Sequence, residues 1–339
     1  MHRRTGYAVS ELIGIIYVLI IITSIVGATL IWALPYMDDK KASVRTESVL
    51  HQLEMMGDVL YDLVHQGEGS CQAVNVVTDA GTVDLSSEGT RFILYYSVNE
   101  SFDFNVIGFD DENDNEFTFI YPCDPGSNYV FWFNVTYLTT GSIENIPKDI
   151  VGGSPYYDIT LNELSLRDAV KIDIVNASAG RKLIGRIWLF DSGSLTYEIS
   201  SPSSTRQVVA ENGGIITVQQ DNGYLFREPV LYNEGDVLVM RMIQFKPGST
   251  TSAGGVGKAT YRFTMEMNTS CIRENKIDIP SCFKLQILKE YSSSWITYLT
   301  SQQGFSSGEV EGTLYLCLQG ERTFSLAHSV CDLELEVFG

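Results

Sequence analysis

An uncharged run of 23 residues, from Leu12 to Leu34, lies near the start of this 339-residue chain. An α-helix rises about 1.5 Å per residue, so a helix of this length crosses a hydrocarbon core of about 30 Å. Arg3 and Arg4 precede the run, and a positively charged flank tends to stay in the cytoplasm. We therefore expect one membrane-spanning helix, with everything after Pro35 outside the cell.

A conventional secretory signal peptide does not fit this start. Its apolar segment typically has about 7–15 residues and ends at small residues. The run here is longer and ends at Trp32-Ala33-Leu34-Pro35.

Glu11 is the residue that a plain membrane anchor leaves unexplained. A carboxylate at the edge of a membrane helix is costly unless it has a partner. Cleavage after Gly6 would make Tyr7 the N-terminus, with a free ammonium. In a helical bundle, the Glu11 carboxylate of one copy could then pair with the Tyr7 ammonium of a neighbour.

The combination of Arg3, Arg4, Gly6 and Glu11 before an apolar run resembles the class III signal peptide of type IV pilins and archaeal pilin-like proteins. In that family a prepilin peptidase cuts after the glycine, and the fifth mature residue is often Glu. The resemblance implies a leader at 1–6, with the prepilin peptidase and other pilin-like subunits as partners. An uncleaved signal anchor is the alternative.

Helical periodicity resumes beyond a charged collar at residues 38–41. Apolar residues recur there at spacings of seven, four, three, four and three, which places them in one narrow seam: Ala42, Val49, Leu53, Met56, Leu60 and Leu63. Two glycines after Gln66 indicate a stop. We predict one helix over 7–66, kinked or briefly broken at Pro35.

The outer half of this helix is the part that follows Pro35, and two arrangements of it are open. In pilins it packs on a globular head, whereas a coiled-coil stalk would leave the seam to a partner helix. The burial of Leu53 and Leu60 separates the two.

From Cys71 onward the sequence is mostly β in character. Aromatic and β-branched runs separated by turn residues predict an antiparallel sandwich or stacked sheets, so the fold class is α+β, mostly β. The predicted strands are 91–96, 105–109, 116–121, 130–137, 169–175, 182–190, 194–199, 214–219, 236–245, 258–267, 283–289, 312–317 and 332–338. Residues 292–299 are the exception and predict a short helix capped by a serine.

The polar segment 200–204 suggests a boundary between two β units, 71–200 and 205–339. One continuous sandwich is the alternative. The small-residue stretch 246–257 predicts an exposed loop.

The last 140 residues carry a looser resemblance to uncharacterised archaeal pilin-like surface proteins. It rests on similarly spaced fragments: Val209 to Gly214, Arg227-Glu228-Pro229, Gly254 to Gly257, Trp295 and Tyr298-Leu299. The resemblance implies an archaeal cell-surface protein and names no ligand.

The chain is strongly acidic, with a formal net charge of −19. Residues 1–37 contain Arg3, Arg4 and Glu11, a sum of +1, so the remainder carries −20. An acidic exterior disfavours nucleic acid and anionic lipid as partners.

All six cysteines follow residue 70, on the expected outer side, where disulfides form. Sequence proximity suggests three pairs: Cys271–Cys282, Cys317–Cys331 and Cys71–Cys123. Zinc is disfavoured because there is no Cys-x-x-Cys and His328 is the only histidine after residue 65.

Two kinds of surface site are suggested. The four Asn-x-Ser/Thr sequons are candidates for glycosylation: Asn99, Asn134, Asn176 and Asn268. Alternating oxygen ligands could hold Ca²⁺, a hard cation, in the acidic segment Asp110, Asp111, Glu112, Asn113, Asp114 and Asn115. A solvated acidic turn is the alternative for that segment, and we expect no other cofactor.

Catalytic motifs are not apparent. Lys258 follows a glycine, but Ser252 and Ala259 break the phosphate-loop pattern. A serine or cysteine nucleophile would have to use His328. A hydrolase whose catalytic groups are carboxylates alone remains an alternative.

We therefore expect a non-enzymatic, pilin-like surface subunit, major or minor. Its helix anchors it in the membrane or in a surface filament, and its acidic head serves adhesion or envelope interaction. The alternatives are an uncleaved single-pass protein with a ligand-binding ectodomain and a membrane-tethered carboxylate hydrolase.

Overall fold

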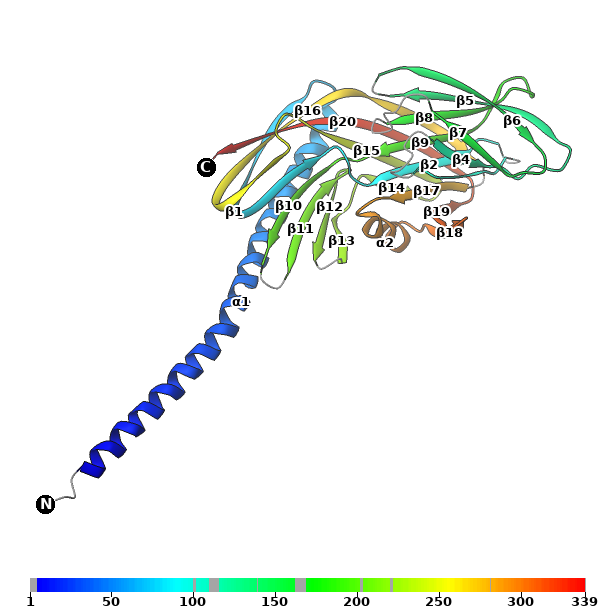
Figure 1. The fold of residues 1–339 in the computed structure, drawn as a ribbon. Helices are drawn as coiled ribbons and strands as arrows, with labels where there is room; N and C mark the ends of the chain where they lie inside the picture. The colour runs from blue at the N-terminus through cyan, green and yellow to red at the C-terminus, as the bar shows by residue number, and fades with distance from the viewer. Residues whose placement is uncertain are drawn as a thin grey trace.

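The computed structural model describes residues 5–99, 102–109, 116–138, 140–161, 169–201, 204–219, 222–280 and 282–338, with the side chains of 5–12, 256 and 269–276 excepted. One long helix projects from a head built almost entirely of strands (Figure 1). This confirms the predicted α+β, mostly β class.

The two described helices are α1 (Thr5–Gln66) and α2 (Ser292–Gln302). The strands of the first half of the head are β1 (Cys71–Ser86), β2 (Arg91–Ser97), β3 (Asn105–Ile107), β4 (Glu116–Ile120), β5 (Asn128–Tyr137), β6 (Ile143–Val151), β7 (Tyr156–Thr160), β8 (Val170–Asn176), β9 (Lys182–Asp191) and β10 (Ser194–Ser200). Those of the second half are β11 (Thr205–Glu211), β12 (Gly214–Gln219), β13 (Asn222–Arg227), β14 (Leu231–Glu234), β15 (Val237–Pro247), β16 (Ser252–Ile279), β17 (Cys282–Leu288), β18 (Ser306–Val310), β19 (Thr313–Gln319) and β20 (Arg322–Phe338).

Helix α1 runs without a break through Pro35, so the predicted interruption there is wrong. Proline removes one backbone N–H from the helical ladder, but both flanks hold the helical conformation. One flank is a long apolar run and the other is packed on the head. The helix ends at Gln66, as predicted, because Gly67 adopts a φ of 91° and its N–H binds the carbonyl of Leu63 at 3.0 Å.

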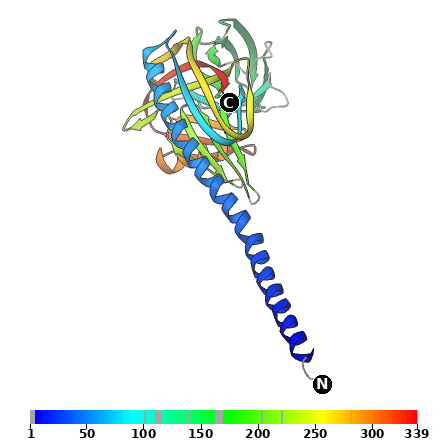
Figure 2. The ribbon, with the colours of Figure 1, turned by 90° about the vertical axis from the view of Figure 1, so that its left-hand side faces the viewer.

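The outer half of α1 packs on its own head. Leu53 and Leu60 are each 2 % exposed. They belong, with the rest of the predicted seam, to a core that β1, β10, β11, β15, β16 and β20 complete. The stalk alternative is therefore wrong, because the seam is already buried within one chain. Figure 2 shows the second half of α1 lying along the strands of the head.

Three sheets make up the head. The largest has nine strands in the order β13-β12-β11-β10-β1-β16-β20-β15-β14, and it covers α1. The second has eight strands in the order β18-β19-β17-β2-β9-β8-β5-β6, and the third has three in the order β3-β4-β7. The pairing is antiparallel except between β15 and β20, which run parallel.

The layers are stacked from α1 outward. One core joins the nine-stranded sheet and α2 to the eight-stranded sheet, and another joins the eight-stranded to the three-stranded sheet. Strand β2 shows why its sequence is a continuous apolar run. Its residues Phe92 and Leu94 enter the first of these cores, whereas Ile93 and Tyr95 enter the second.

The predicted division near residue 200 is not followed by the hydrogen bonding of the sheets. Strands β10 and β11 form a hairpin across this point. Both larger sheets combine strands from before and after it.

Two local predictions are wrong. Most of the expected loop at 246–257 is strand, because β16 begins at Ser252 and pairs with β1. Helix α2 begins after Tyr291 without a side-chain cap, so no serine serves that role.

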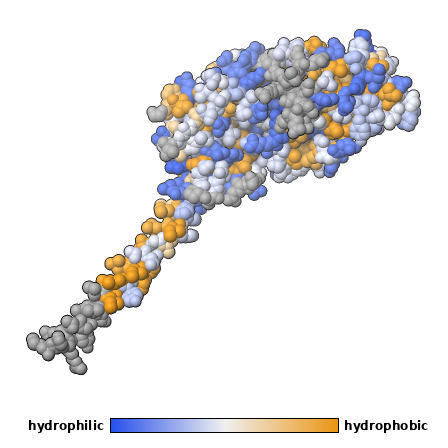
Figure 3. Space-filling view, viewed as in Figure 1, coloured by the Kyte–Doolittle hydropathy of each residue, from blue (hydrophilic) through white to orange (hydrophobic). Residues whose placement is uncertain are grey.

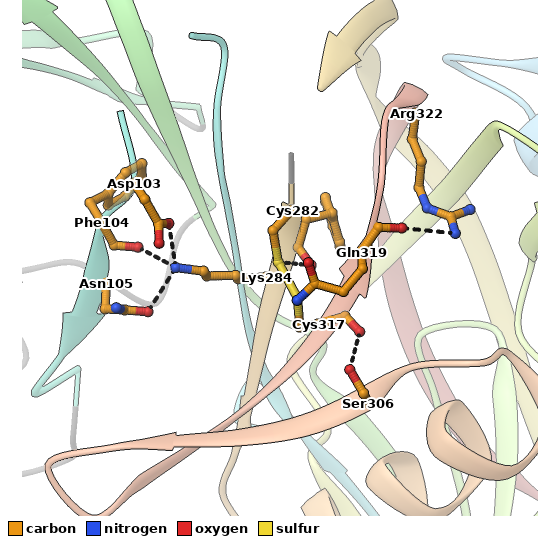
Figure 4. The surroundings of a disulfide bond; sticks show 10 residues. Asp103, Phe104, Asn105, Cys282, Lys284, Ser306, Cys317, Gln319 and Arg322 are labelled. Carbon is orange, nitrogen blue, oxygen red and sulfur yellow. Dashed lines mark hydrogen bonds and ion pairs between the residues drawn. A yellow bond between two sulfur atoms is a disulfide. The ribbon is translucent and has the colours of Figure 1, made fainter. Parts of the chain in front are cut away.

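One disulfide joins Cys282 and Cys317 (Figure 4). It links β17 and β19, which are neighbours in the eight-stranded sheet. Three of the cysteines whose side chains are described form no disulfide: Cys71, Cys123 and Cys331. All three pairs suggested by proximity are therefore wrong, because sheet order rather than chain distance brings cysteines together. The side chain of Cys271 lies outside the described residues.

Replacing Leu53 by Ala should lower the free energy of unfolding by about 2–5 kcal/mol, since it leaves a cavity between α1 and the nine-stranded sheet. Met55, which is 56 % exposed on the opposite face, supplies the control, Met55→Ala. Denaturant titration of the full chain in detergent measures both. Equal small effects would show that the seam is not packed on the head.

Candidate functional site: membrane helix and docked head

The inner half of α1 presents an unbroken apolar surface. From Ile13 onward, α1 is the one helix among the described residues that is long and apolar enough to cross a membrane. Its described apolar side chains do not pack on the head, as the exposure of Ile31 (77 %) and Trp32 (70 %) illustrates, and Figure 3 shows apolar colour along the shaft. Leaving apolar surface in water costs about 25 cal/mol per Å². This half is therefore long and apolar enough to span a membrane.

Aromatic rings mark the outer end of the apolar run. Trp32 and Tyr36 stack with their ring centroids 5.7 Å apart, and the Lys40 ammonium lies 5.6 Å from the Tyr36 ring. Tryptophan and tyrosine favour the membrane–water interface, where an apolar ring body meets a polar edge. The interface is therefore expected near residues 32–40.

The head contacts α1 immediately beyond this level. One oxygen of Asp39 accepts hydrogen bonds from the hydroxyls of Ser201 (3.1 Å) and Ser204 (3.3 Å), next to the β10–β11 turn. The Arg206 guanidinium lies 3.6 Å from the same oxygen. Asp39 is five residues past Leu34, or about 7.5 Å along a helix. The head therefore contacts α1 directly beyond the apolar run.

Arg227, at the end of β13, binds α1 about halfway along the docked segment. Its Nη1 donates to the Glu54 carbonyl at 2.6 Å and lies 2.8 Å from an Asp58 carboxylate oxygen. A Cβ on Gly57 would stand 2.9 Å from the guanidinium carbon. Gly57 thus leaves room for the arginine to lie across the helix.

Further contacts fix α1 on either side of this point. The Gln52 amide accepts from the N–H of Val77 (2.7 Å) and donates to its carbonyl (3.0 Å). Near the end of the helix, Arg241 lies over the Tyr61 ring and within 3.3 Å of His65. Polar contacts from Asp39 to His65, together with the buried seam, make the outer half of α1 and the head one body.

The residues predicted for leader cleavage and assembly lie at the opposite end. Arg3 and Arg4 lie outside the described residues. Gly6, Tyr7 and Glu11 fall within the helical backbone of α1, but their side chains are not described. Their roles therefore stay predictions.

The sequons occupy different environments. Asn268 is exposed, and its amide binds Asp332. Asn134 lies mid-strand in β5, between β6 and β8, with a buried amide oxygen. Asn99 and Asn176 are half-buried at strand ends. Asn268 is therefore the most accessible acceptor; the calcium candidate, 110–115, lies outside the described residues.

His328 is enclosed in the core and does not face a surface site. Its ring stacks on Phe190 with centroids 5.0 Å apart, and burial lowers its pKa to about 4. It is therefore neutral at physiological pH. No nucleophile on the described surface can use it as a base.

Glu211 is a fully buried carboxylate, 0 % exposed. It accepts hydrogen bonds from the hydroxyl and N–H of Thr90 (2.6 and 3.2 Å), from Ser192 (3.4 Å) and from the indole of Trp295. Burial raises its pKa, and these donors oppose the rise. Because its partners come from three separate segments, it joins the two large sheets and α2, with no opening to substrate.

Lys284 joins the second and third layers in a similar way. Its ammonium donates to Asp103 (2.7 Å), the Phe104 carbonyl (2.8 Å) and Asn105 (3.0 Å), as Figure 4 shows. An ammonium has three donors, so all are used. Strand β17 is thereby bound to the segment that leads into β3.

An open groove near the end of β16 gathers three carboxylates, those of Asp236, Asp278 and Glu321. All three residues are exposed. A hydrolase normally shields its acid from water to raise its pKa. This groove offers its carboxylates no such shielding.

No protein-family model, curated protein or solved structure matches this chain. Its function is therefore inferred from its own residues and geometry.

A single feature of the sequence indicated the arginine contacts to α1. Gly57 stands alone inside an otherwise regular amphipathic helix, where glycine costs about 1 kcal/mol relative to alanine. Such a glycine indicates a close approach, although it does not reveal Arg227 as the partner.

Replacing Gly57 by Ala should be neutral or destabilising, because the gain in helix propensity is offset by displacement of Arg227. In an Arg227→Ala background the same change should stabilise by about 1 kcal/mol. Unfolding free energies of the four proteins in this cycle measure the coupling. An identical effect of Gly57→Ala in both backgrounds would contradict the contact.

Stability should fall in acid through His328. Its pKa is about 4 when folded and about 6.5 in an unfolded chain, so the contribution is complete above pH 6.5 and is lost as pH falls toward 4. Between pH 7 and 4.5, His328→Phe should remove roughly 2–3 kcal/mol of the loss shown by the unmodified protein. Denaturant titrations at the two pH values measure this.

The control is His51→Gln, on the exposed face of α1. It should leave the acid-induced loss unchanged. If His328→Phe retains the full loss, the ring is not held neutral by the core.

Proposed function

We propose that this chain is a type IV pilin-like surface subunit that is anchored or assembled through the inner half of α1 and displays an acidic β head. One observation carries the proposal: a single helix is apolar and bare over its first half and buried against its own head over its second. Such a subunit combines a helix for anchoring or assembly with a β head that is fixed to the same helix.

The start of the chain supports processing by a prepilin peptidase. Arg3 and Arg4 precede Gly6, and Glu11 would be the fifth residue after cleavage. The new Tyr7 ammonium could neutralise the Glu11 carboxylate of an adjoining copy within an apolar bundle, where an unpaired charge is costly. This pairing would set the axial register between copies.

The head is large for a minimal filament subunit, which favours a minor, accessory or adhesive role. Its three stacked sheets extend away from the membrane helix (Figure 1). The far layers are therefore the ones best placed to meet another surface or an envelope component.

An uncleaved single-pass protein with a ligand-binding ectodomain is the alternative. It would share the helix and the docked head but not the processing. The mature N-terminus separates the two directly.

The protein should be expressed with a prepilin peptidase, purified from membranes and examined by intact-mass and N-terminal peptide mass spectrometry. We expect the mature chain to begin at Tyr7, and Gly6→Ala to retain residues 1–6. Gly14→Ala is the matched control, since an added Cβ there meets no atom within 4 Å and cleavage should proceed. An unmodified chain that keeps its initiator methionine would contradict the pilin proposal.

A further inference from the structure

Three cations gather on one side of α1 just above its apolar run. Lys40, Lys41 and Arg45 line an open hollow of about 640 Å³ together with Tyr36, Met37 and Val44. These positions differ by three, four, seven and eight residues, the spacing of one helical face. The opposite wall is Asp79, at a register irregularity in β1.

Nearby carboxylates compensate only part of this charge. Asp38 pairs with Lys41 at 3.7 Å, with both side chains more than half exposed. Asp39 points to the head, where it binds Ser201, Ser204 and Arg206. In the described part of the chain, no carboxylate forms an ion pair with Lys40 or Arg45. A local excess of positive charge therefore stands out on a chain of net charge −19.

The depth of the cluster fits the lipid phosphates. Lys40 lies six residues past Leu34, or about 9 Å along the helix axis. The head-group layer adds about 5–7 Å to each side of the hydrocarbon core. Helical side chains lean toward the helix N-terminus, which here is toward the membrane, so long cationic side chains reach back into this layer.

We propose that Tyr36, Lys40, Lys41 and Arg45 form a binding site for the phosphate of a lipid head group in the outer leaflet. The inference rests on the proposed membrane insertion of α1 and goes beyond it by naming a lipid site. The cations supply the charge, and Tyr36, 52 % exposed beside Met37 and Val44, covers the glycerol region. The cluster offsets the repulsion between an anionic membrane surface and the head, which is anchored at Asp39 on the same turn of α1.

Spin-labelled lipids test the site in the full-length protein. The protein is reconstituted into phosphatidylcholine vesicles that contain a trace of spin-labelled phosphatidylglycerol or spin-labelled phosphatidylcholine. The fraction of each label that the protein restricts is then compared. We expect about a five-fold preference for phosphatidylglycerol, as one net cation near the surface provides, and a decline of this preference in high salt.

Variants assign the preference to this hollow. The triple variant Lys40→Gln, Lys41→Gln, Arg45→Gln should lose it. A control with the same charge change on the head, Lys148→Gln, Arg181→Gln, Lys182→Gln, should keep it, since these residues lie in or next to β6 and β9 of the eight-stranded sheet, which takes no part in the core around α1. Asp79→Asn should raise it by removing the opposing carboxylate.

Two results overturn the site alone: equal restriction of the two labelled lipids by the unmodified protein, or an unchanged preference in the triple variant. Abolition of the preference by inorganic phosphate at constant ionic strength would also overturn it, because the hollow would then take free phosphate. If the protein fails to float with the vesicles and restricts neither label, α1 does not insert. In that case the proposed function fails together with the lipid site.

Discussion

The burial of the α1 seam against its own head is the interaction on which the rest of the structure depends. Helix α1 is 62 residues long, and isolated helices gain little stability in water. Packing from Ala42 to Leu63 holds its outer half, and the same contacts close the inner face of the nine-stranded sheet. Without them, that sheet would expose an apolar face and the helix would be a loose tether.

Buried polar groups connect the successive layers of the head. Glu211 joins the two large sheets, and Lys284 joins the second sheet to the third. Arg91 and Asp191 add a fully buried bidentate pair between β2 and β9, with distances of 2.8 and 3.0 Å. Each such group is costly to bury alone, so each requires its partner in place. The head that Asp39 fixes on α1 is thereby tied together through to its third layer.

Sequence reasoning succeeded where the signal was local. The seam was visible because its spacing follows the helical period, and Gly67 marked the helix end. Strand β2 was visible as an apolar run that is buried on both faces. The predicted strand 169–175 is likewise present as β8, in which Val170, Ile172 and Ile174 are buried alternately.

It failed where the outcome depends on distant segments. Strand β1 was missed because the segment Asp79-Ala80-Gly81 interrupts its alternation of buried and exposed residues, so its full length is set by pairing with β16. The Cys282–Cys317 disulfide follows from strand order, which the sequence does not display. The contact between Arg227 and the Glu54 carbonyl spans 173 residues. Gly57 could therefore be recognised as unusual inside a helix, but its partner could not be identified.

Hydrogen exchange of the full chain in a membrane mimetic tests the central claim most directly. If the outer half of α1 is part of the head, its amides between residues 42 and 63 should stay protected for as long as those of β1 and β10, and open with them. Rapid exchange of that segment while the strands remain protected would contradict the account, because it would make the helix a separate element that only leans on the head.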